Sequence, residues 1–334
     1  MKVSVLLPTI GREAFLRTSL RSVAAQTALD MIGEVIISDN RPTGVAEKIA
    51  AEFPDLPIRI IRREPALEAN THFKVLPEDA RYELSAILHD DDWWSPVHLA
   101  SALAALVSTP SSVACYTAFA EVTEESSPVW GDPSIGVWFG ADYAALDQPW
   151  AMNLASVCIA SFPGTFGRFS ALVARTEALC QAGYIYDLGN PFDTDRMLGV
   201  ALALQGPLAY APTPTVYIRR HPTQDGGRFA REAIVGHMAD TTRWIIAQAK
   251  EQNVDLRAEI SRRELACPAE QLPKLAQLWQ WKWTRDVLQS ERLWPESFTA
   301  PLSSPVHSHS LGIRDFVPPF LLGVARSLLR RSSA

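Results

Sequence analysis

The sequence is poor in cysteine and has no long apolar run. Its four cysteines lie far apart in 334 residues, without a CxxC pair. This spacing provides neither a disulfide framework nor a zinc knuckle, and it predicts buried free thiols in a reducing compartment. The longest apolar run near the C-terminus, residues 316–325, contains two prolines and is about half as long as a membrane span. The N-terminal apolar stretch is too short for a signal peptide, so we expect a soluble, cytoplasmic protein.

An excess of basic charge and the glycine-rich phosphate loops are also missing. The chain has 31 basic and 37 acidic side chains and a formal charge of −6, which argues against a nucleic-acid partner. It contains no GxGxxG and no GxxxxGK[ST] motif, so it lacks the phosphate-binding loops of dinucleotide dehydrogenases and P-loop NTPases. A content of 47% hydrophobic and 20% charged residues is typical of a globular protein.

Short apolar runs alternate with amphipathic stretches in the first hundred residues. The pattern predicts strands at 3–7, 35–37, 58–61 and 84–88, and helices at 13–27, 45–53 and 73–80. Ser95 and Pro96 predict the N-cap and first turn of another helix. Right-handed crossovers would place these strands in one mostly parallel sheet flanked by helices, which is an α/β fold.

The pattern changes twice further along the chain. Residues 121–165 hold four prolines and little periodicity, which predicts a long irregular segment of functional importance. Helices are expected again near 174–182 and from Asp193 onward, and the sequence becomes mainly helical after residue 227. We therefore predict an α/β domain over residues 1–228 and a mainly helical C-terminal extension over residues 229–334.

Polar clusters follow three of the predicted strands, at the edge where open parallel sheets bind ligands. They are Pro8–Arg12, Ser38–Arg41 and the run His89–Trp94. The three consecutive carboxylates of that last run, Asp90, Asp91 and Asp92 (the acidic run), repel one another unless a cation lies among them. Mg²⁺ and Mn²⁺ prefer oxygen ligands of this kind, together with substrate phosphates. The alternative is a solvated acidic turn at the start of the next helix, which the two adjoining tryptophans make less fitting.

Other polar residues have two interpretations each. Asp39 fits either a turn-forming aspartate or a contact to the base or ribose of a nucleoside. Asp193 and Asp195 fit either helix capping or a general base that faces the acidic run. Arg219 and His221 fit either a basic loop or contacts to phosphate and metal.

Taken in order, these clusters resemble the inverting nucleotide-sugar glycosyltransferases of family two, which have the GT-A fold. The resemblance covers residues 3–225. The motifs that carry it are Val5-Leu6-Leu7-Pro8-Thr9, Ile36-Ile37-Ser38-Asp39-Asn40, Leu88-His89-Asp90-Asp91-Asp92-Trp93-Trp94, Asp187 with Phe192-Asp193-Thr194-Asp195, and Tyr217-Ile218-Arg219-Arg220-His221-Pro222. Each motif alone is weak, and the specificity comes from their order.

The resemblance implies a role for each matched position, with a UDP-sugar as the favoured donor and Mn²⁺ or Mg²⁺ as cofactor. Asp91 would be the chief metal ligand. The acceptor would be a glycan or a lipid-linked sugar, whose hydroxyl is deprotonated by an aspartate. The residues implied for the donor nucleotide are Pro8, Thr9, Arg12, Asp39, Asn70 and Asp90, and those implied for other donor or acceptor contacts are Asp92, Trp93, Trp94 and Arg219.

The chain departs from the family pattern at two positions. His89 stands where many members have the first aspartate of Asp-x-Asp, so metal ligation would rest on Asp91 alone or recruit His221. Phe192 replaces the glutamate that usually precedes the base. Both Asp193 and Asp195 are therefore candidates for the base, and we favour Asp193.

Two alternatives for function and one for the tail remain open. A metal-dependent nucleotidyl or phosphoryl transferase could use the same carboxylates, and a nucleotide-sugar binding module could have lost its base. Residues 311–334 carry four arginines among apolar residues, which fits peripheral contact with the inner face of a membrane. The same segment fits a helix that packs on the domain, because Pro318 and Pro319 interrupt its pattern.

Overall fold

The computed structural model describes residues 1–123, 150–162, 166–190, 192–221, 231–266 and 282–295. Its centre is a nine-stranded sheet with the order β3-β2-β1-β4-β8-β6-β9-β5, and β7 pairs with β9. The strands are β1 (Val3–Thr9), β2 (Ile32–Asp39), β3 (Ile58–Arg62), β4 (Leu84–Ile87), β5 (Trp93–Trp94), β6 (Ala114–Thr123), β7 (Trp150–Met152), β8 (Leu172–Arg175) and β9 (Leu208–Arg220).

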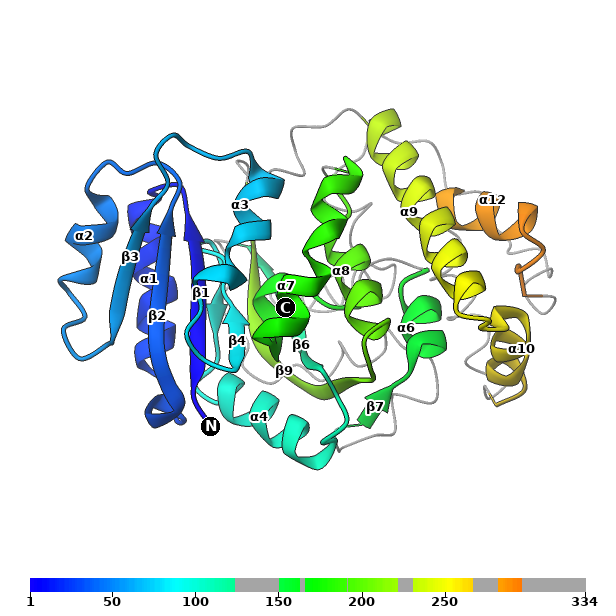
Figure 1. Cartoon of the computed structure of the whole chain (residues 1–334), viewed down its shortest axis with the longest axis horizontal. Coiled ribbons are helices and arrows are strands. Elements are labelled where there is room, and N and C mark those ends of the chain that lie inside the picture. The colour runs from blue at the N-terminus through cyan, green and yellow to red at the C-terminus, as the bar shows by residue number, and fades with distance from the viewer. Residues whose placement is uncertain (124–149, 163–165, 191, 222–230, 267–281, 296–334) are drawn as a thin grey trace, which may run out of the picture.

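Helices cover both faces of this sheet (Figure 1). The α-helices are α1 (Glu13–Ala24), α2 (Val45–Ala50), α3 (Ala69–Val75), α4 (His98–Ser108), α6 (Leu154–Ala160), α7 (Thr176–Ala182), α8 (Thr194–Ala203), α9 (Arg231–Glu251), α10 (Leu256–Ala266) and α12 (Lys282–Ser290). Short 3-10 helices are η1 (Leu29–Met31), η2 (Pro77–Asp79), η4 (Phe169–Ala171) and η5 (Gly183–Leu188). Among the described residues, no helix is long and apolar enough to cross a membrane.

The period-two alternation of the strands divides the core into two clusters. Val5 and Leu7 of β1 face one side with α1, α2 and α4, whereas Leu6 faces the other side with α7 and α8. Successive side chains of a strand point to opposite faces of a sheet, and here both faces are covered. The apolar runs of the N-terminal strands are therefore continuous rather than alternating.

The four strands expected from the N-terminal pattern are all present. The pairs β1–β2, β1–β4 and β2–β3 are parallel, which confirms the mostly parallel α/β sheet. β8 runs antiparallel to both neighbours, β4 and β6, and β6 pairs with β9 in parallel. The sheet therefore consists of a parallel half and a mixed half that meet at the β4–β8 pair.

Several predicted element bounds were wrong. The helix expected at 73–80 lies at Ala69–Val75, because Pro77 begins a separate 3-10 turn. Ser95 is not the N-cap of α4: the helix begins at His98, and the Ser95 amide donates to the carbonyl of Thr215 over 2.8 Å. Part of the segment expected to be irregular is regular, since β7 and α6 lie within 150–160.

The helices after residue 231 pack on the same core cluster as α8. Ile245, Leu256 and Leu288 of α9, α10 and α12 belong to this cluster. Figure 1 shows α9 beside α8, α10 beside α6, and α12 beside α9. The helical character of the extension is thus confirmed where it is described, and the domain boundary at residue 228 stays a prediction. Residues 124–149 and the basic tail 311–334 lie outside the described residues.

Candidate active site

The ends of β1, β2 and β4 bring the predicted polar clusters to one edge of the sheet. Thr9, the last residue of β1, pairs directly with Asp39, the last residue of β2. β4 ends at Ile87, which pairs with Leu6, so the run that begins at His89 follows beside the end of β1. The polar segments are thus neighbours because their strands are neighbours.

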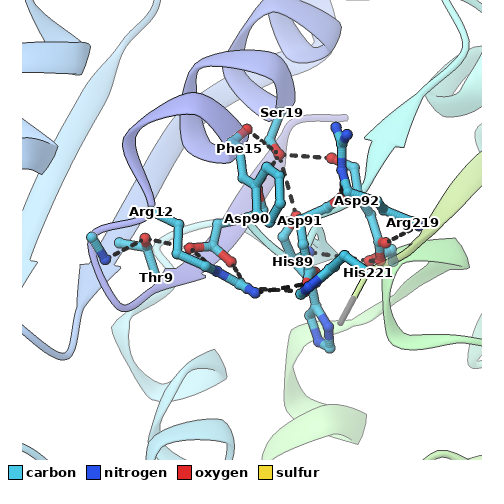
Figure 2. A network of polar contacts seen from close by, with 12 residues as sticks. Thr9, Arg12, Phe15, Ser19, His89, Asp90, Asp91, Asp92, Arg219 and His221 are labelled. Carbon is cyan, nitrogen blue, oxygen red and sulfur yellow. Dashed lines mark hydrogen bonds and ion pairs between the residues drawn. The ribbon is translucent and has the colours of Figure 1, made fainter. Parts of the chain in front are cut away.

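Asp90 is held between Thr9 and Arg12. The Thr9 hydroxyl donates to Asp90 Oδ2 over 2.6 Å, and the Arg12 guanidinium forms an ion pair with the same carboxylate. Gly11 has a φ of 80°, a conformation that favours glycine, and its amide donates to Thr9 Oγ1 over 3.0 Å. Burial raises the pKa of Asp90 while Arg12 and Thr9 oppose the change. Thr9 and Arg12, at the end of β1 and in the turn after it, therefore fix the position of Asp90 (Figure 2).

Asp91 lies between two basic side chains that are far apart in the sequence, Arg12 and His221. Its Oδ2 is 2.9 Å from Arg12 Nη2 and 3.1 Å from His221 Nε2, which follows β9. Burial alone would raise the pKa of Asp91, but the hydrogen bond with His221 and the charges of His89 and Arg12 lower it overall. The structure brings together the two residues, Asp91 and His221, that the sequence singled out for metal binding.

Asp92 is a buried anchor of the site. Its Oδ2 accepts a hydrogen bond from the Ser170 hydroxyl over 2.5 Å, and its Oδ1 accepts one from the Arg219 amide over 3.0 Å. Burial raises the pKa of Asp92 well above its usual value. Both Asp92 oxygens thus bind the protein, and the expected contact of Asp92 with donor or acceptor stays a prediction.

The two tryptophans of the run lie in different surroundings. Trp94 is buried, its Nε1 donates to the carbonyl of Ser170 over 2.6 Å, and its ring stacks on His98. Trp94 thus belongs to the core in this structure, and its expected contact with donor or acceptor stays a prediction. Trp93 is partly exposed and stacks on Tyr217, with ring centroids 5.5 Å apart.

Arg219 binds the backbone of the acidic run and packs against two aromatic rings. Its guanidinium carbon lies 4.6 Å from the ring centroid of Phe15 and 4.8 Å from that of Trp93, and Nε donates to the carbonyl of Asp91 over 2.9 Å. Two cation–π contacts and a backbone hydrogen bond hold this side chain in one orientation. In this arrangement Arg219 positions Asp91.

His89, Asp91 and Asp92 form a donor set for a divalent cation. One potential ligand atom from each lies within 4.8 Å of the others. The His89 ring packs against Phe73 and Phe169, at centroid distances of 5.2 and 5.4 Å, and its buried Nε2 has no hydrogen-bond partner among the described residues. Carboxylate oxygens suit Mg²⁺ and Mn²⁺, so the two aspartates fit a divalent ion of the kind that the sequence predicted, and His89 lies beside them as a third potential ligand.

Asp39, the last residue of β2, has a carboxylate oxygen without a hydrogen-bond partner among the described residues. Its Oδ1 accepts from the Arg41 amide over 3.0 Å, whereas its buried Oδ2 has no partner among the described residues. Burial raises the pKa of Asp39. Because an unpaired buried acceptor is costly, a hydrogen-bond donor from a ligand would stabilise this carboxylate. Pro8, which was also predicted for the donor nucleotide, lies buried in β1 opposite Ser38.

Asn70 links α3 to the segment that leads into α8. Its Nδ2 lies 3.5 Å from the carbonyl oxygen of Tyr186 and 3.3 Å from that of Asn190. In this structure the amide thus positions two backbone segments. Its expected contact with the nucleotide stays a prediction.

Asp193 and Asp195 face different surroundings at the start of α8. Arg196 Nη1 donates to Asp193 Oδ2 over 2.6 Å, both side chains are buried, and burial raises the pKa of Asp193 to about 6 despite the charge of Arg196. Asp195 is 20% exposed, accepts from the Phe169 amide over 3.1 Å and pairs with Arg168 over 3.1 Å. Asp195 therefore binds the residue of η4 that precedes Ser170, whose hydroxyl binds Asp92.

Two serines that sequence reasoning missed hold this site together. Ser19 of α1 places its hydroxyl 2.9 Å from the carbonyl of Asp90 and 2.6 Å from that of Asp92. Ser170 of η4 binds Asp92 and also accepts a hydrogen bond from the His89 amide over 3.1 Å. Neither serine lies in a motif, and only the folded arrangement brings them to the acidic run, so no signal in the sequence could have found them.

The sequence of residues 4–170 matches the family described as Glycosyl transferase family 2. The chain belongs to this family. Uncharacterized protein Rv1520 of Mycobacterium tuberculosis (strain ATCC 25618 / H37Rv) is similar to it, with 25% identity over 224 residues, 66% of this chain and 59% of that protein. The chain thus spans less than two thirds of this relative.

Solved structures show the same fold at low sequence identity. S. aureus TarS 1-349 in complex with UDP-GlcNAc superposes with a TM-score of 0.52 at 15% identity, covering 88% of this chain and 83% of TarS 1-349. S. aureus TarS 1-349 alone gives a TM-score of 0.51 at 16% identity, covering 87% of this chain and 72% of that chain. The fold of this family 2 protein is the GT-A fold that the motifs predicted.

Proposed function

We propose that this family 2 protein is an inverting glycosyltransferase that moves a sugar from a nucleoside-diphosphate sugar to a hydroxyl group of a glycan or lipid-linked acceptor. The observation that carries the proposal is that two potential ligand-binding groups lie at one sheet edge. These are the buried, unpartnered Oδ2 of Asp39 and the His89–Asp91 pair of potential metal ligands. Such a pairing suits a molecule with a nucleoside at one end and a metal-bound diphosphate at the other.

The donor is proposed to be a UDP-sugar, with Asp39 on its nucleoside and Thr9 and Arg12 near its phosphates. Support comes from S. aureus TarS 1-349, which shares the fold and was solved in complex with UDP-GlcNAc. A divalent ion, Mn²⁺ or Mg²⁺, held by His89 and Asp91 would neutralise negative charge on the departing diphosphate. Arg219 orients Asp91 for that ligation through the hydrogen bond to its carbonyl.

We propose Asp195 as the general base, rather than the Asp193 that the motif favoured. A base must reach the proton it removes, and Asp193 is enclosed with Arg196 whereas Asp195 is partly exposed. The Phe169 amide and Arg168 hold the Asp195 carboxylate next to the segment that supports Asp92. Asp195 would accept the hydroxyl proton as the acceptor oxygen bonds to the anomeric carbon and the bond to the diphosphate breaks.

The acceptor, the pathway and the cellular location are part of the same proposal. A lipid-linked acceptor would place the protein at the inner face of a membrane, and the basic residues of 311–334 would suit that surface. We propose that the protein lies in the cytoplasm, where it adds sugars to such an acceptor during polysaccharide synthesis.

The experiment that tests the function uses a panel of UDP- and GDP-sugars with a polyprenyl-linked or oligosaccharide acceptor, with Mn²⁺ or with EDTA. We expect metal-dependent release of a nucleoside diphosphate and a product of inverted anomeric configuration by NMR. Asp195→Asn should lose turnover by at least about 100-fold while it keeps UDP binding. Release of pyrophosphate would indicate a nucleotidyltransferase, and donor binding without turnover on any acceptor would indicate a binding module. Either result overturns the proposal.

A further inference from the structure

The Arg12 guanidinium lies among the carboxylates of the acidic run. Its guanidinium pairs with Asp90, and its Nη2 lies 2.9 Å from Asp91 Oδ2. Its Nη1 lies 3.4 Å from His221 Nε2, so the same side chain spans the two groups that flank Asp91. Figure 2 shows the guanidinium lying between the carboxylates and His221.

A guanidinium and a divalent ion cannot both bind one carboxylate oxygen at full strength. An opposite charge within 4–6 Å changes the affinity of a carboxylate for a proton by about 10- to 1,000-fold. The same electrostatic term acts on a metal ion, because Arg12 both neutralises Asp91 and repels a second cation. While Arg12 stays on Asp91, binding of metal to that oxygen is therefore weakened.

Arg12 and Arg219 differ in how firmly they are held. Arg219 lies between two aromatic rings and bonds to a backbone carbonyl. Arg12 has one longer cation–π contact, 5.4 Å from the ring centroid of Phe15, and its guanidinium otherwise contacts side chains of the site itself. Its side chain is 27% exposed and belongs to the residue that precedes α1, directly after the positive-φ Gly11. The Arg12 head group can thus leave the carboxylates by side-chain rotation without breaking a strand or a helix.

We propose that Arg12 is an exchangeable counter-cation: its guanidinium neutralises Asp91 while the donor is absent, and it transfers to the donor diphosphate when the metal takes Asp91. This inference rests on the donor site of the proposed function. Arginine binds phosphate through the same planar fork that binds carboxylate. One side chain thereby couples the order of metal and donor binding, since each ligand favours the Arg12 position that the other requires.

The test measures two affinities of Arg12→Gln by calorimetry, for MnCl₂ without nucleotide and for UDP without metal. Without the guanidinium on Asp91, we expect Mn²⁺ to bind at least about 10-fold more tightly. Without a guanidinium for the diphosphate, we expect UDP to bind about 10-fold more weakly. The two affinities change in opposite directions, which a merely structural defect in the site would not produce. Arg12→Lys, which keeps the charge but loses the fork, should give intermediate values.

Arg17→Gln is the matched control. This substitution removes a guanidinium from α1, the helix that follows Arg12, where Arg17 pairs with Glu13 and Glu52. Both affinities should equal those of the wild type. Mn²⁺ binding by Arg12→Gln that is no tighter than that of the wild type, or unchanged UDP binding, would each overturn the inference. Sugar transfer by the wild type is measured separately, so opposite affinity changes without any turnover would overturn the proposed function alone.

Discussion

Arg196 and Asp193 form a buried ion pair within the first turn of α8, with 2.6 Å between Nη1 and Oδ2. The other guanidinium contacts reach beyond the helix. Nε donates to the carbonyl of Ser161 over 2.7 Å, and Nη2 donates to the Thr242 hydroxyl over 2.9 Å. The pair therefore joins α8 to α9 and to the end of α6.

Removal of Asp193 should destabilise the protein. Asp193→Ala leaves Arg196 charged, buried and without its carboxylate, a change that costs about 3–5 kcal/mol in comparable pairs. Urea denaturation gives the free energy of unfolding for both proteins. Asp240→Ala, which breaks the exposed pair with Arg243, is the control and should lie within about 1 kcal/mol of the wild type. Equal losses in the two variants would contradict a structural role for the buried pair.

Stability should fall in acid because His98 is buried as the neutral imidazole. Burial lowers the pKa of His98 to about 3, whereas an unfolded histidine titrates near 6.5. Between these values the unfolded state binds a proton that the folded state excludes, so stability decreases as pH falls below about 6.5.

The measurement compares the pH dependence of unfolding in the wild type and in His98→Gln. The wild-type free energy should fall more steeply, by about 1.4 kcal/mol per pH unit between pH 4 and 6. His72, whose pKa burial lowers to about 4, contributes in the same direction in both proteins. Identical slopes would show that His98 does not produce this dependence.

Loss of the Ser170 hydroxyl should weaken the support of the acidic run. Ser170→Ala removes the donor to Asp92 Oδ2 and the acceptor for the His89 amide, and unsatisfied buried partners cost about 1–3 kcal/mol. Chemical denaturation tests this expectation. Ser108→Ala, at the exposed end of α4, should change stability by less than about 0.5 kcal/mol, and a Ser170 variant as stable as that control would argue against the anchor.

A methyl group added at Gly167 should be poorly tolerated. It would collide with the ring of Tyr116, a buried side chain of β6 that packs against Phe166, and overpacking of this kind costs about 1–3 kcal/mol. Gly236 provides the opposite case in α9, since nothing lies within 4 Å of its added methyl. Gly236→Ala should stabilise the helix by up to about 1 kcal/mol. Thermal unfolding of both variants would show opposite shifts, and a shared direction would contradict the packing argument.

The N-terminal half of the fold was accessible from the sequence because its signals are local. The buried runs of β1 and β2 and the helical spacing of Leu16, Leu20 and Val23 in α1 occur within one element each. Consecutive parallel strands with short crossovers then leave few possible topologies. The polar strand ends could be assigned to one edge for the same reason.

The second half of the sheet was missed because its strands depend on distant partners. β8 is four residues long, and its Ala174 was assigned to the following helix. β9 contains Pro212 and Pro214, which resemble breaks in a strand, and its register with β6 shifts near Ala118. Tertiary pairing decides such segments more than local preference does.

The choice of a base shows the same division. Both aspartates before α8 were recognised, but their difference lies in contacts with Arg196 and with Phe169, neither of which a linear motif encodes. His89 was noticed as a departure from the pattern. Its packing against Phe73 and Phe169, with Nε2 left without a hydrogen-bond partner among the described residues, could be seen only in the fold.

The meeting of the two sheet halves at the β4–β8 pair sets the time at which the site can form during folding. Three residue pairs make this seam, from Leu84 with Arg175 to Ala86 with Val173, and each closes a loop of roughly 90 residues, a slow step for a folding chain. Until they pair, Ser170 cannot meet Asp92. Hydrogen exchange at Trp94 Nε1, which donates to the Ser170 carbonyl, should therefore slow only when this long-range pairing is complete.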